Sequence, residues 1–403
     1  MRLLQINAAV NYGSTGRIAE DIGTAAIANG YESYIAAADT SRKSKSEVIT
    51  IGNDFDKKLH GVKSLLLDRH GFGSSGATNK LVSEIKRVKP DIIHLHNLHG
   101  YYLHIGILFN YLKQSPVPVV WTFHDCWPFT GHCSFFDAVN CFKWQTHCNK
   151  CPNLKGYPSS YGLDQSERNF KEKREIFNGV RSLRIVTPSN WLANHVRKSF
   201  LAGYPVEAIH NGVDTNIFKS DQPLQSIFEK YGLKDKPIVL GVANVWDKRK
   251  GLNAFIELSK ILPADFQIML VGLTPKQIAA LPANIKGIER TKSIEELAAL
   301  YAAANVFVNP TTVDNFPTTN IEALSCGTPV ITYNTGGSPE AIDSNTGFVV
   351  AKGDIKMLGD CIQSAAANGK LMYSKPCRER ALQYFNKDDR YRDYLNLYQQ
   401  LMN

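Results

Sequence analysis

Residues Thr311–Ile342 read TTVDNFPTTNIEALSCGTPVITYNTGGSPEAI. Two carboxylates, Asp314 and Glu322, stand on either side of a proline turn and the start of a short predicted helix. A turn at residues 325–329, a β-branched apolar run at 330–332 and a pair of glycines follow. Most of the chain repeats this alternation of short apolar strands with helical segments, which predicts an α/β fold with parallel sheets covered by helices.

The polar residues of this stretch suit the binding of a phosphorylated sugar. A helix does not begin before Pro317, because the residue preceding a proline is pushed out of the α region. From Thr318 the pattern is helical, and a proline and threonines suit a first turn. The N–H groups of a helix start favour an anion, and Glu322, one turn further in, is placed to accept hydrogen bonds from sugar hydroxyls. Taken alone, the two carboxylates are also typical of a solvated, acidic helix start.

Size and composition indicate a two-domain globular protein. The chain has 403 residues, of which 43% are hydrophobic and 21% charged, enough for two sizeable cores. No apolar run approaches the ~20 residues that cross a bilayer. The first residues, MRLLQINAAVNYGSTG, indicate a strand, a glycine loop and a helix rather than a signal peptide. We therefore expect a cytoplasmic protein.

The expected elements fall into two halves, with a seam near residues 188–218 that contains an Asn-Gly turn. In the first half we expect strands at Leu3–Asn7, Ser33–Ala37, Ile92–His96, Val119–His124 and Leu183–Thr187, and helices at Gly16–Asn29, Ala77–Val88 and Leu103–Lys113. In the second half we expect strands at Ile238–Val242, Phe266–Val271, Val306–Asn309 and Val330–Tyr333, and helices at Leu252–Ile261, Ile294–Ala303 and Thr319–Ser325. The tail from 354 to 402 is expected to be largely helical.

The residues from Asp314 to Gly337 resemble the donor-site signature of retaining glycosyltransferases of family four, E-x(7)-E followed by A-x-x-x-G-x-P-V-I and a G-G turn. Asp314 stands where a glutamate is usual, so it keeps the charge and loses one methylene of reach. The resemblance covers nearly the full length and implies the GT-B fold, in which two Rossmann-like domains face each other across a deep cleft. It implies an acceptor-binding domain at 1–205, a nucleotide-sugar domain at 206–380 and a helix at 381–403 that crosses back to the first domain.

Within that resemblance, the stretch supplies most of the donor site. Glu322 is expected to hold the nucleotide ribose, and Asp314 the donor hexose. The backbone that follows Asp314 is expected to hold hexose and phosphate, and it comprises Asn315, Phe316, Pro317, Thr318 and Thr319.

A glycine loop after the first strand is a second candidate for phosphate binding. It contains Gly13, Ser14, Thr15 and Gly16 and opens a helix. Glycine lets the backbone approach a ligand closely, and a helix start favours phosphate. An ordinary strand-to-helix turn is the alternative, but the position matches the loop that closes over the donor diphosphate in the family.

A basic loop follows the first strand of the second half. Its sequence, GVANVWDKRKG at 241–251, places Arg249 and Lys250 to stabilise a leaving diphosphate, Arg as a fork and Lys as a point charge. Asn244 stands where related enzymes have an arginine. A charged surface turn is the alternative interpretation.

Histidines follow two strands of the first half. In WTFHDCWPF, His124 resembles the family histidine that contacts the donor hexose near the reacting carbon, and Asp125 is interpreted as an orienting group. A lone histidine at a strand end is also commonly structural. His96 and His99, in DIIHLHNLHGYY, are expected to line the acceptor side rather than to bind a metal.

A cysteine-rich insertion occupies residues 126–152. Four of its cysteines form C-x(7)-C-x(6)-C-x(2)-C, namely Cys133, Cys141, Cys148 and Cys151. A terminal C-x-x-C within such a cluster suits tetrahedral thiolate ligation of a structural zinc. His132 and His147 are alternate ligands, and reduced thiols or disulfides are the other interpretations. A similar insertion occurs in some family-four enzymes of bacterial surface-polysaccharide synthesis.

These features predict a retaining transferase that moves a hexose from a UDP- or GDP-sugar to a glycan acceptor, lipid-linked in the preferred interpretation, without a catalytic cofactor. The formal charge of +9 favours anionic partners, including an anionic membrane at the inner face of the cell. No nucleic-acid motif accompanies the basic clusters. The rivals are a GT-B phosphorylase or epimerase, and a zinc-stapled carbohydrate- or nucleic-acid-binding protein that has lost catalysis.

Overall fold

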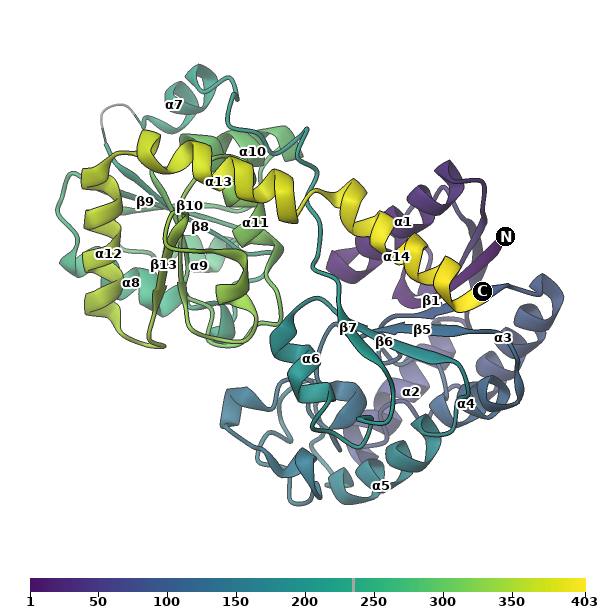
Figure 1. The fold of residues 1–403 in the computed structure, drawn as a ribbon. Helices are drawn as coiled ribbons and strands as arrows, with labels where there is room; N and C mark the ends of the chain where they lie inside the picture. Colours follow the sequence, from purple (N-terminus) through teal and green to yellow (C-terminus); the bar gives the residue numbers. More distant parts are fainter. Residues whose placement is uncertain (234–235) are drawn as a thin grey trace. The chain divides into compact units, whose positions relative to one another are not determined.

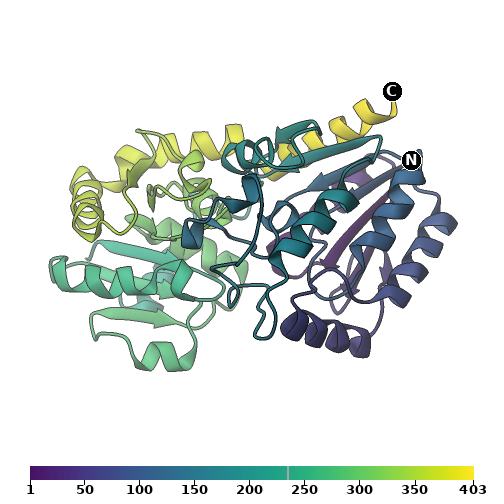
Figure 2. The same ribbon diagram turned by 90° about the horizontal axis from the view of Figure 1, so that it is seen from below.

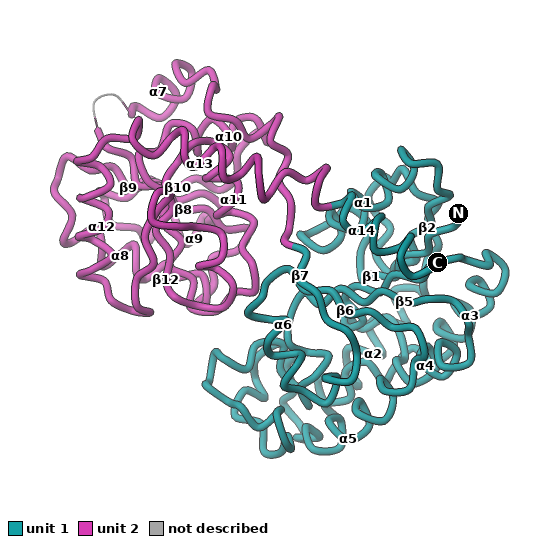
Figure 3. Tube along the Cα trace, viewed as in Figure 1, with its two compact units in different colours: residues 1–209, 391–403 teal, residues 210–390 magenta. Residues whose placement is uncertain are grey.

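The computed structural model describes residues 1–233 and 236–403 and divides the chain into two compact units (Figures 1 and 3). Unit 1 comprises Met1–Ile209 with Tyr391–Asn403, and unit 2 comprises His210–Arg390. Each unit has its own parallel sheet and its own hydrophobic core. The two Rossmann-like α/β domains expected from the sequence are confirmed.

The sheet of unit 1 has seven strands in the order β3-β2-β1-β4-β5-β6-β7, and every described pairing is parallel. The strands are β1 (Arg2–Ala9), β2 (Glu32–Asp39), β3 (Glu47–Thr50), β4 (Ile92–Leu95), β5 (Val119–Thr122), β6 (Leu183–Thr187) and β7 (Val206–Ala208). The chain adds strands outward from β1 in one direction and from β4 in the other. The switch in direction therefore lies between β1 and β4, where open α/β sheets bind ligands at their carboxyl ends.

Helices pack alongside the strands of unit 1 (Figure 2). They are α1 (Gly13–Ala28), α2 (Asp54–Leu67), α3 (Ser75–Val88), α4 (Ile105–Gln114), α5 (Ser166–Phe177) and α6 (Asn190–Val196). The last helix, α14 (Lys387–Met402), buries Tyr391, Tyr394, Leu395 and Tyr398 in a cluster with residues of β1 and α1. The hydroxyl of Tyr398 lies 2.6 Å from Nδ1 of His94 on β4. The C-terminal segment is thus part of the core of unit 1.

The sheet of unit 2 has six parallel strands in the order β10-β9-β8-β11-β12-β13. They are β8 (Ile238–Val242), β9 (Gln267–Val271), β10 (Ile285–Ile288), β11 (Val306–Asn309), β12 (Val330–Tyr333) and β13 (Gly347–Val350). Its helices are α7 (Gln225–Tyr231), α8 (Leu252–Ile261), α9 (Pro275–Ala279), α10 (Ile294–Ala303), α11 (Thr318–Ser325), α12 (Ile355–Asn368) and α13 (Lys370–Tyr384). Here the direction of strand addition switches between β8 and β11.

The central strands lie within about two residues of their predicted ranges, whereas three edge strands were not predicted. Leu183–Thr187, Ile238–Val242, Val306–Asn309 and Val330–Tyr333 are strands with the bounds that the sequence predicts. The strands β3, β10 and β13 were missed because each is an edge strand of four residues that pairs on one side only, too short to give a clear pattern. Helix α2 was missed because its exposed side is apolar and its buried side polar, the reverse of the usual pattern. None of the described helices combines the length and apolar character of a bilayer-spanning segment.

Candidate functional site

The loop between β11 and α11 lies at the carboxyl end of the unit 2 sheet, beside the switch point. Pro317 occupies the N-cap position of α11, and no side chain of the described residues caps this helix. Thr318 and Thr319, in the first turn, are half-buried. The start of α11 therefore offers backbone N–H groups to an anion, as the sequence predicts for this helix.

A buried polar network holds α11 against the neighbouring strands. The amide of Asn309, at the end of β11, donates to Oδ1 of Asn320 over 2.8 Å. In turn, the amide nitrogen of Asn320 donates to Oγ of Ser338 over 2.9 Å, and Ser338 Oγ lies 2.7 Å from Oγ1 of Thr332 on β12. These side chains are fully or almost fully buried, so the bonds compensate each group for its lost water. The network joins β11, β12 and α11.

The glycine pair after β12 lies directly behind the carboxylate loop. Gly336 adopts φ +56°, and a Cβ built on it would stand 1.6 Å from the carbonyl oxygen of Asp314. The N–H of Gly337 donates to the carbonyl of Asn315 over 2.9 Å. Only glycine suits this position, both for its φ and for its closeness to another backbone. The glycine turn thereby sets the position of Asp314.

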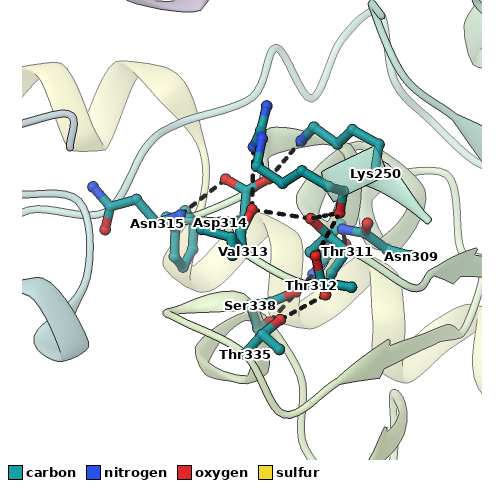
Figure 4. Close-up of polar contacts among 12 residues, drawn as sticks. Lys250, Asn309, Thr311, Thr312, Val313, Asp314, Asn315, Thr335 and Ser338 are labelled. Carbon is teal, nitrogen blue, oxygen red and sulfur yellow. Dashed lines mark hydrogen bonds and ion pairs between the residues drawn. The ribbon is translucent and has the colours of Figure 1, made fainter. Parts of the chain in front are cut away.

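The structure brings Asp314, Arg249 and Lys250 together, although 64 positions separate Lys250 from Asp314 in the chain. Nζ of Lys250 lies 2.5 Å from Oδ2 of Asp314, and Nη1 of Arg249 lies 3.7 Å from the same oxygen. Arg249 also donates to the carbonyl of Val313 over 3.1 Å, and its own carbonyl accepts from the N–H of Thr312 over 2.8 Å. Figure 4 shows Lys250 reaching toward the Asp314 carboxylate. Nε of Arg249 also lies 3.7 Å from Oδ2 of Asp247, so two cations and two carboxylates share one site.

Glu322 is oriented by a tyrosine that the sequence analysis missed. The hydroxyl of Tyr301, on α10, donates to Oε2 of Glu322 over 2.9 Å. Burial, and then the neighbouring carboxylate, raise the pKa of Tyr301 well above its ordinary value, so the phenol stays a donor. Glu322 itself is half-buried. No sequence signal marks Tyr301, because it lies 21 positions away on another helix.

The remaining predicted residue of unit 2, Asn244, lies in the exposed loop after β8. Two positions later, the buried indole of Trp246 donates to the carbonyl of Val271 over 2.9 Å and anchors that loop. Asn244 is thus at the same edge of the sheet as Asp314, since both follow neighbouring central strands.

In unit 1, the glycine loop connects β1 to α1 at the corresponding switch point. Gly13 adopts φ +66° and begins α1, for which no described side chain serves as a cap. A Cβ on Gly16 would stand 3.0 Å from the carbonyl oxygen of Ala9, so this glycine packs helix against strand. Ser14 is exposed and Thr15 half-buried. The loop presents a second helix N-terminus at the carboxyl end of a sheet.

Three histidines and one glutamine form a row along β1, β4 and the segments after β4 and β5, in which His124 is half-buried and the others are buried. Oε1 of Gln5 lies 3.0 Å from Nε2 of His96, and Nδ1 of His96 lies 3.2 Å from Nε2 of His124. The amide nitrogen of Gln5 donates to the carbonyl of Ala19 over 2.8 Å, which turns Oε1 toward His96. The His94 ring lies 4.0 Å from the His96 ring, centroid to centroid, with the two planes tilted by 34°. Gln5 is the member that sequence reasoning missed.

These contacts determine which ring nitrogen of His96 and of His124 carries the proton. Burial lowers the pKa of His124 to about 4 and that of His96 well below its ordinary value, so both rings are neutral near pH 7. Because the Gln5 oxygen only accepts, His96 carries its proton on Nε2, and its Nδ1 accepts from the Nε2–H of His124. His124 then keeps the lone pair on Nδ1. His124 is therefore a hydrogen-bond acceptor with a fixed tautomer.

His99 and Asp125 form a separate pair. Nε2 of His99 lies 2.7 Å from Oδ2 of Asp125, and its Nδ1 lies 3.1 Å from the hydroxyl of Tyr157. Burial alone would raise the pKa of Asp125, but the neighbouring His99 and the N–H of Trp127 bring it below its ordinary value. The carboxylate stays charged and orients the His99 ring.

The four cysteines of the C-x(7)-C-x(6)-C-x(2)-C pattern line one small cavity together with His132 and Trp144. Contact with the Cys133 thiol lowers the pKa of Cys151, whereas the same contact raises that of Cys133. His132 donates through Nδ1 to Asp68 over 2.5 Å, and its buried Nε2 has no hydrogen-bond partner among the described residues. Among the residues that the structure describes, no group of three or more His, Cys, Asp or Glu side chains is already placed to hold a metal. All eight cysteines are free thiols. The structure gathers the thiols without forming a metal-ligand set.

Comparisons with known proteins agree with this architecture. The family model "Glycosyltransferase Family 4" matches residues 15–217, and "Glycosyl transferases group 1" matches residues 236–368. A protein of Escherichia coli (strain K12) named as the colanic acid biosynthesis glycosyl transferase WcaC is 26% identical, over 100% of both chains. The capsular polysaccharide biosynthesis glycosyltransferase CapM of Staphylococcus aureus is 28% identical, over 38% of this chain and 43% of its own.

Solved structures share the fold along the whole chain. The sucrose-phosphate synthase of Thermosynechococcus elongatus superposes with a TM-score of 0.72 at 20% identity, covering 99% of this chain and 98% of its own. Anabaena HepE, in complex with UDP and glucose, gives a TM-score of 0.70 at 16% identity, over 99% of this chain and 100% of its own. The predicted GT-B fold class is confirmed. Since one family model alone spans half of the sequence, the chain belongs to glycosyltransferase family 4 and is a glycosyltransferase.

Proposed function

We propose that the chain transfers a hexose, with retention, from a nucleoside diphosphate donor to a lipid-linked glycan during the synthesis of a bacterial surface polysaccharide. The observation that carries the proposal is the pairing of Lys250 with Asp314 at the open start of α11. Cations and helix N–H groups suit a diphosphate, whereas the carboxylates suit sugar hydroxyls. The relatives named for colanic acid and capsular polysaccharide biosynthesis support the acceptor class. We place the reaction in the cytoplasm, at the inner face of the membrane.

Each candidate site residue of unit 2 has a role in this proposal. Glu322, oriented by Tyr301, accepts hydrogen bonds from the ribose hydroxyls. Asp314 and the backbone of 315–319 hold the hexose and a phosphate. Lys250 and Arg249 neutralise the diphosphate, and Asn244 contacts it from the loop after β8. The nucleotide is UDP or GDP.

The residues of unit 1 complete the assignment. Gly13, Ser14, Thr15 and Gly16 bind phosphate at the start of α1. His124, whose tautomer His96 fixes, contacts the donor hexose near the reacting carbon. His99, oriented by Asp125, contacts the acceptor glycan.

The chemistry is a front-side displacement at the anomeric carbon. The bond from this carbon to the phosphate oxygen breaks, and a bond to the acceptor oxygen forms on the same face. The acceptor proton passes to the departing phosphate oxygen, so no protein nucleophile is required. Lys250, Arg249 and the start of α11 stabilise the charge that develops on the diphosphate. An organised site of this kind argues for catalysis rather than for an inactive carbohydrate- or nucleic-acid-binding protein.

Titration of the purified chain with UDP and GDP tests the donor site. We expect one of them to raise the melting temperature, since a ligand stabilises the folded state according to its affinity. Glu322→Ala should weaken that nucleotide about tenfold or more, because hydrogen bonds to a charged group contribute roughly 1.5–3 kcal/mol. Glu257→Ala, on the exposed side of α8, is the matched control. A chain that binds neither nucleotide, or a Glu322 variant that binds normally, would contradict the proposal.

The pH profile of transfer tests the histidine row. His124 has a pKa of about 4, lowered from 6.5 by burial, so it remains an acceptor until the pH falls toward 4. We expect transfer to persist below pH 6.5, and His124→Ala to lower kcat about 10²–10³-fold while nucleotide binding is kept. Gln5→Leu, which frees the tautomer, should lower kcat less and leave nucleotide binding unchanged. Activity lost with a midpoint near 6.5 would refute the assignment.

Stability must be followed in the same experiment. The unfolded chain binds protons at these histidines near pH 6.5, whereas the folded chain does not. The free energy of unfolding should therefore decrease as the pH falls through 6.5. A melting curve at each pH separates this loss from the titration of His124 in the active protein.

We keep the structural zinc as a proposal for the cysteine cavity. Thiolates from Cys133, Cys141, Cys148 and Cys151 would hold it. Nε2 of His132, which has no hydrogen-bond partner within the described ranges, is an alternate ligand that Asp68 already orients. The sulfurs must close on the metal for this to hold, since they are not yet a ligand set. Metal analysis of the purified chain should give about one zinc per molecule. Metal-free protein with four reactive thiols would exclude it.

A further inference from the structure

Helix α2 carries its apolar side on the surface of unit 1. Phe55, Leu59, Val62 and Leu66 are 72%, 59%, 52% and 52% exposed. They follow one another at spacings of four, three and four residues, which places them in a single stripe along the helix. We call these four side chains the α2 stripe. Isolated exposed apolar residues are ordinary, but a continuous stripe marks an interaction surface.

The buried side of α2 is polar and fixes the helix in this orientation. His60 and Ser64 are each only 2% exposed. Nε2 of His60 accepts from the N–H groups of Gly71 and Gly73 over 3.3 and 3.2 Å, and Ser64 Oγ lies 3.1 Å from Nδ1 of His70. Rotation of the stripe into the core would break these buried bonds. The exposure of the stripe is therefore built into the fold.

A neighbouring loop extends the α2 stripe. The N–H of Tyr161 donates to the carbonyl of Leu65 over 2.9 Å, and that of Leu163 donates to the carbonyl of Leu66 over 3.0 Å. Both side chains are exposed, Tyr161 more than Leu163. A tyrosine beside aliphatic side chains is typical of the boundary between water and lipid.

Positive charge borders the α2 stripe on both sides. On a helix of 3.6 residues per turn, Lys58 and Lys63 fall on opposite flanks of the line from Phe55 to Leu66. Both lysines are exposed, and Nζ of Lys63 also donates one hydrogen bond to the carbonyl of Phe72 over 2.7 Å, which leaves its other protons for a second partner. The chain as a whole carries a formal charge of +9. Lysines at the edge of an apolar face extend their ammonium groups to the phosphates of lipid headgroups while their stems lie along apolar surface.

We propose that α2 and residues 161–163 dock on a bilayer that contains anionic lipids. The α2 stripe enters the boundary between headgroups and acyl chains, and Lys58 and Lys63 meet the lipid phosphates. This surface rests on the proposed function, because a lipid-linked acceptor keeps its reactive sugar near the membrane. It would hold unit 1, with its acceptor-side residues, at the bilayer surface.

Vesicle co-sedimentation of the full chain tests this surface. We expect binding to phosphatidylcholine vesicles that contain phosphatidylglycerol, and much weaker binding to phosphatidylcholine alone. Phe55→Ser with Leu66→Ser should weaken the binding more than tenfold. Leu371→Ser with Met372→Ser, which removes two exposed apolar side chains of α13 in unit 2, should leave it unchanged. Lys58→Gln with Lys63→Gln should reduce the preference for anionic vesicles.

Three outcomes would overturn the inference. One is a wild-type chain that sediments with neither kind of vesicle. Another is an α2 stripe variant that binds anionic vesicles as strongly as the wild type does. A self-associated wild type that the α2 stripe variant converts to monomer in sedimentation would assign the surface to a second copy instead. Nucleotide-induced stabilisation, measured on the same samples, reports on the donor site in unit 2, so a failure of the membrane surface is distinguishable from a failure of the proposed function.

Discussion

The backbone of Gly336 touches the backbone of Asp314 so closely that no side chain fits between them. A Cβ at Gly336 would lie 1.6 Å from the Asp314 carbonyl oxygen. Together with the buried Asn320 network, this contact connects two neighbouring strand ends and the start of α11. A backbone contact of this kind leaves little room for the loop backbone to move. The carboxylate loop is therefore positioned before any ligand arrives, which is how a site lowers the entropic cost of binding.

The charges of this site compensate one another within unit 2. Lys250 lies against Asp314, and the Tyr301 phenol holds Glu322. Side chains paired in this way remain ordered without a ligand. A ligand that replaces these contacts must carry anionic groups for the cations and hydroxyl donors for the carboxylates. A sugar nucleotide is such a ligand, since its diphosphate competes for Lys250 and its hydroxyls compete for Asp314. Binding would exchange one set of charge-assisted hydrogen bonds for another.

How much could be foreseen depended on the distance of each contact along the sequence. The fold class and the central strands were predictable, because fully buried strands such as Ile238–Val242 have short-range apolar patterns. The start of α11 after Pro317 was also predictable, because a proline restricts the residues next to it. Tyr301, Asn320 and Gln5 were not identified, since each acts through a partner on another element. Helix α2 was missed because its pattern is reversed, and the cysteine spacing indicated proximity without giving the geometry of the sulfurs.

A crystal structure of the chain with its nucleoside diphosphate tests the central claim most directly. The account predicts the diphosphate at the start of α11, with Lys250 moved from Asp314 to a phosphate oxygen and Glu322 within hydrogen-bond distance of the ribose. The loop from Asp314 to Thr319 should keep its backbone conformation, because Gly336 and Asn320 hold it. A nucleotide bound elsewhere while Lys250 stays on Asp314, or a loop that rearranges to receive it, would contradict the account.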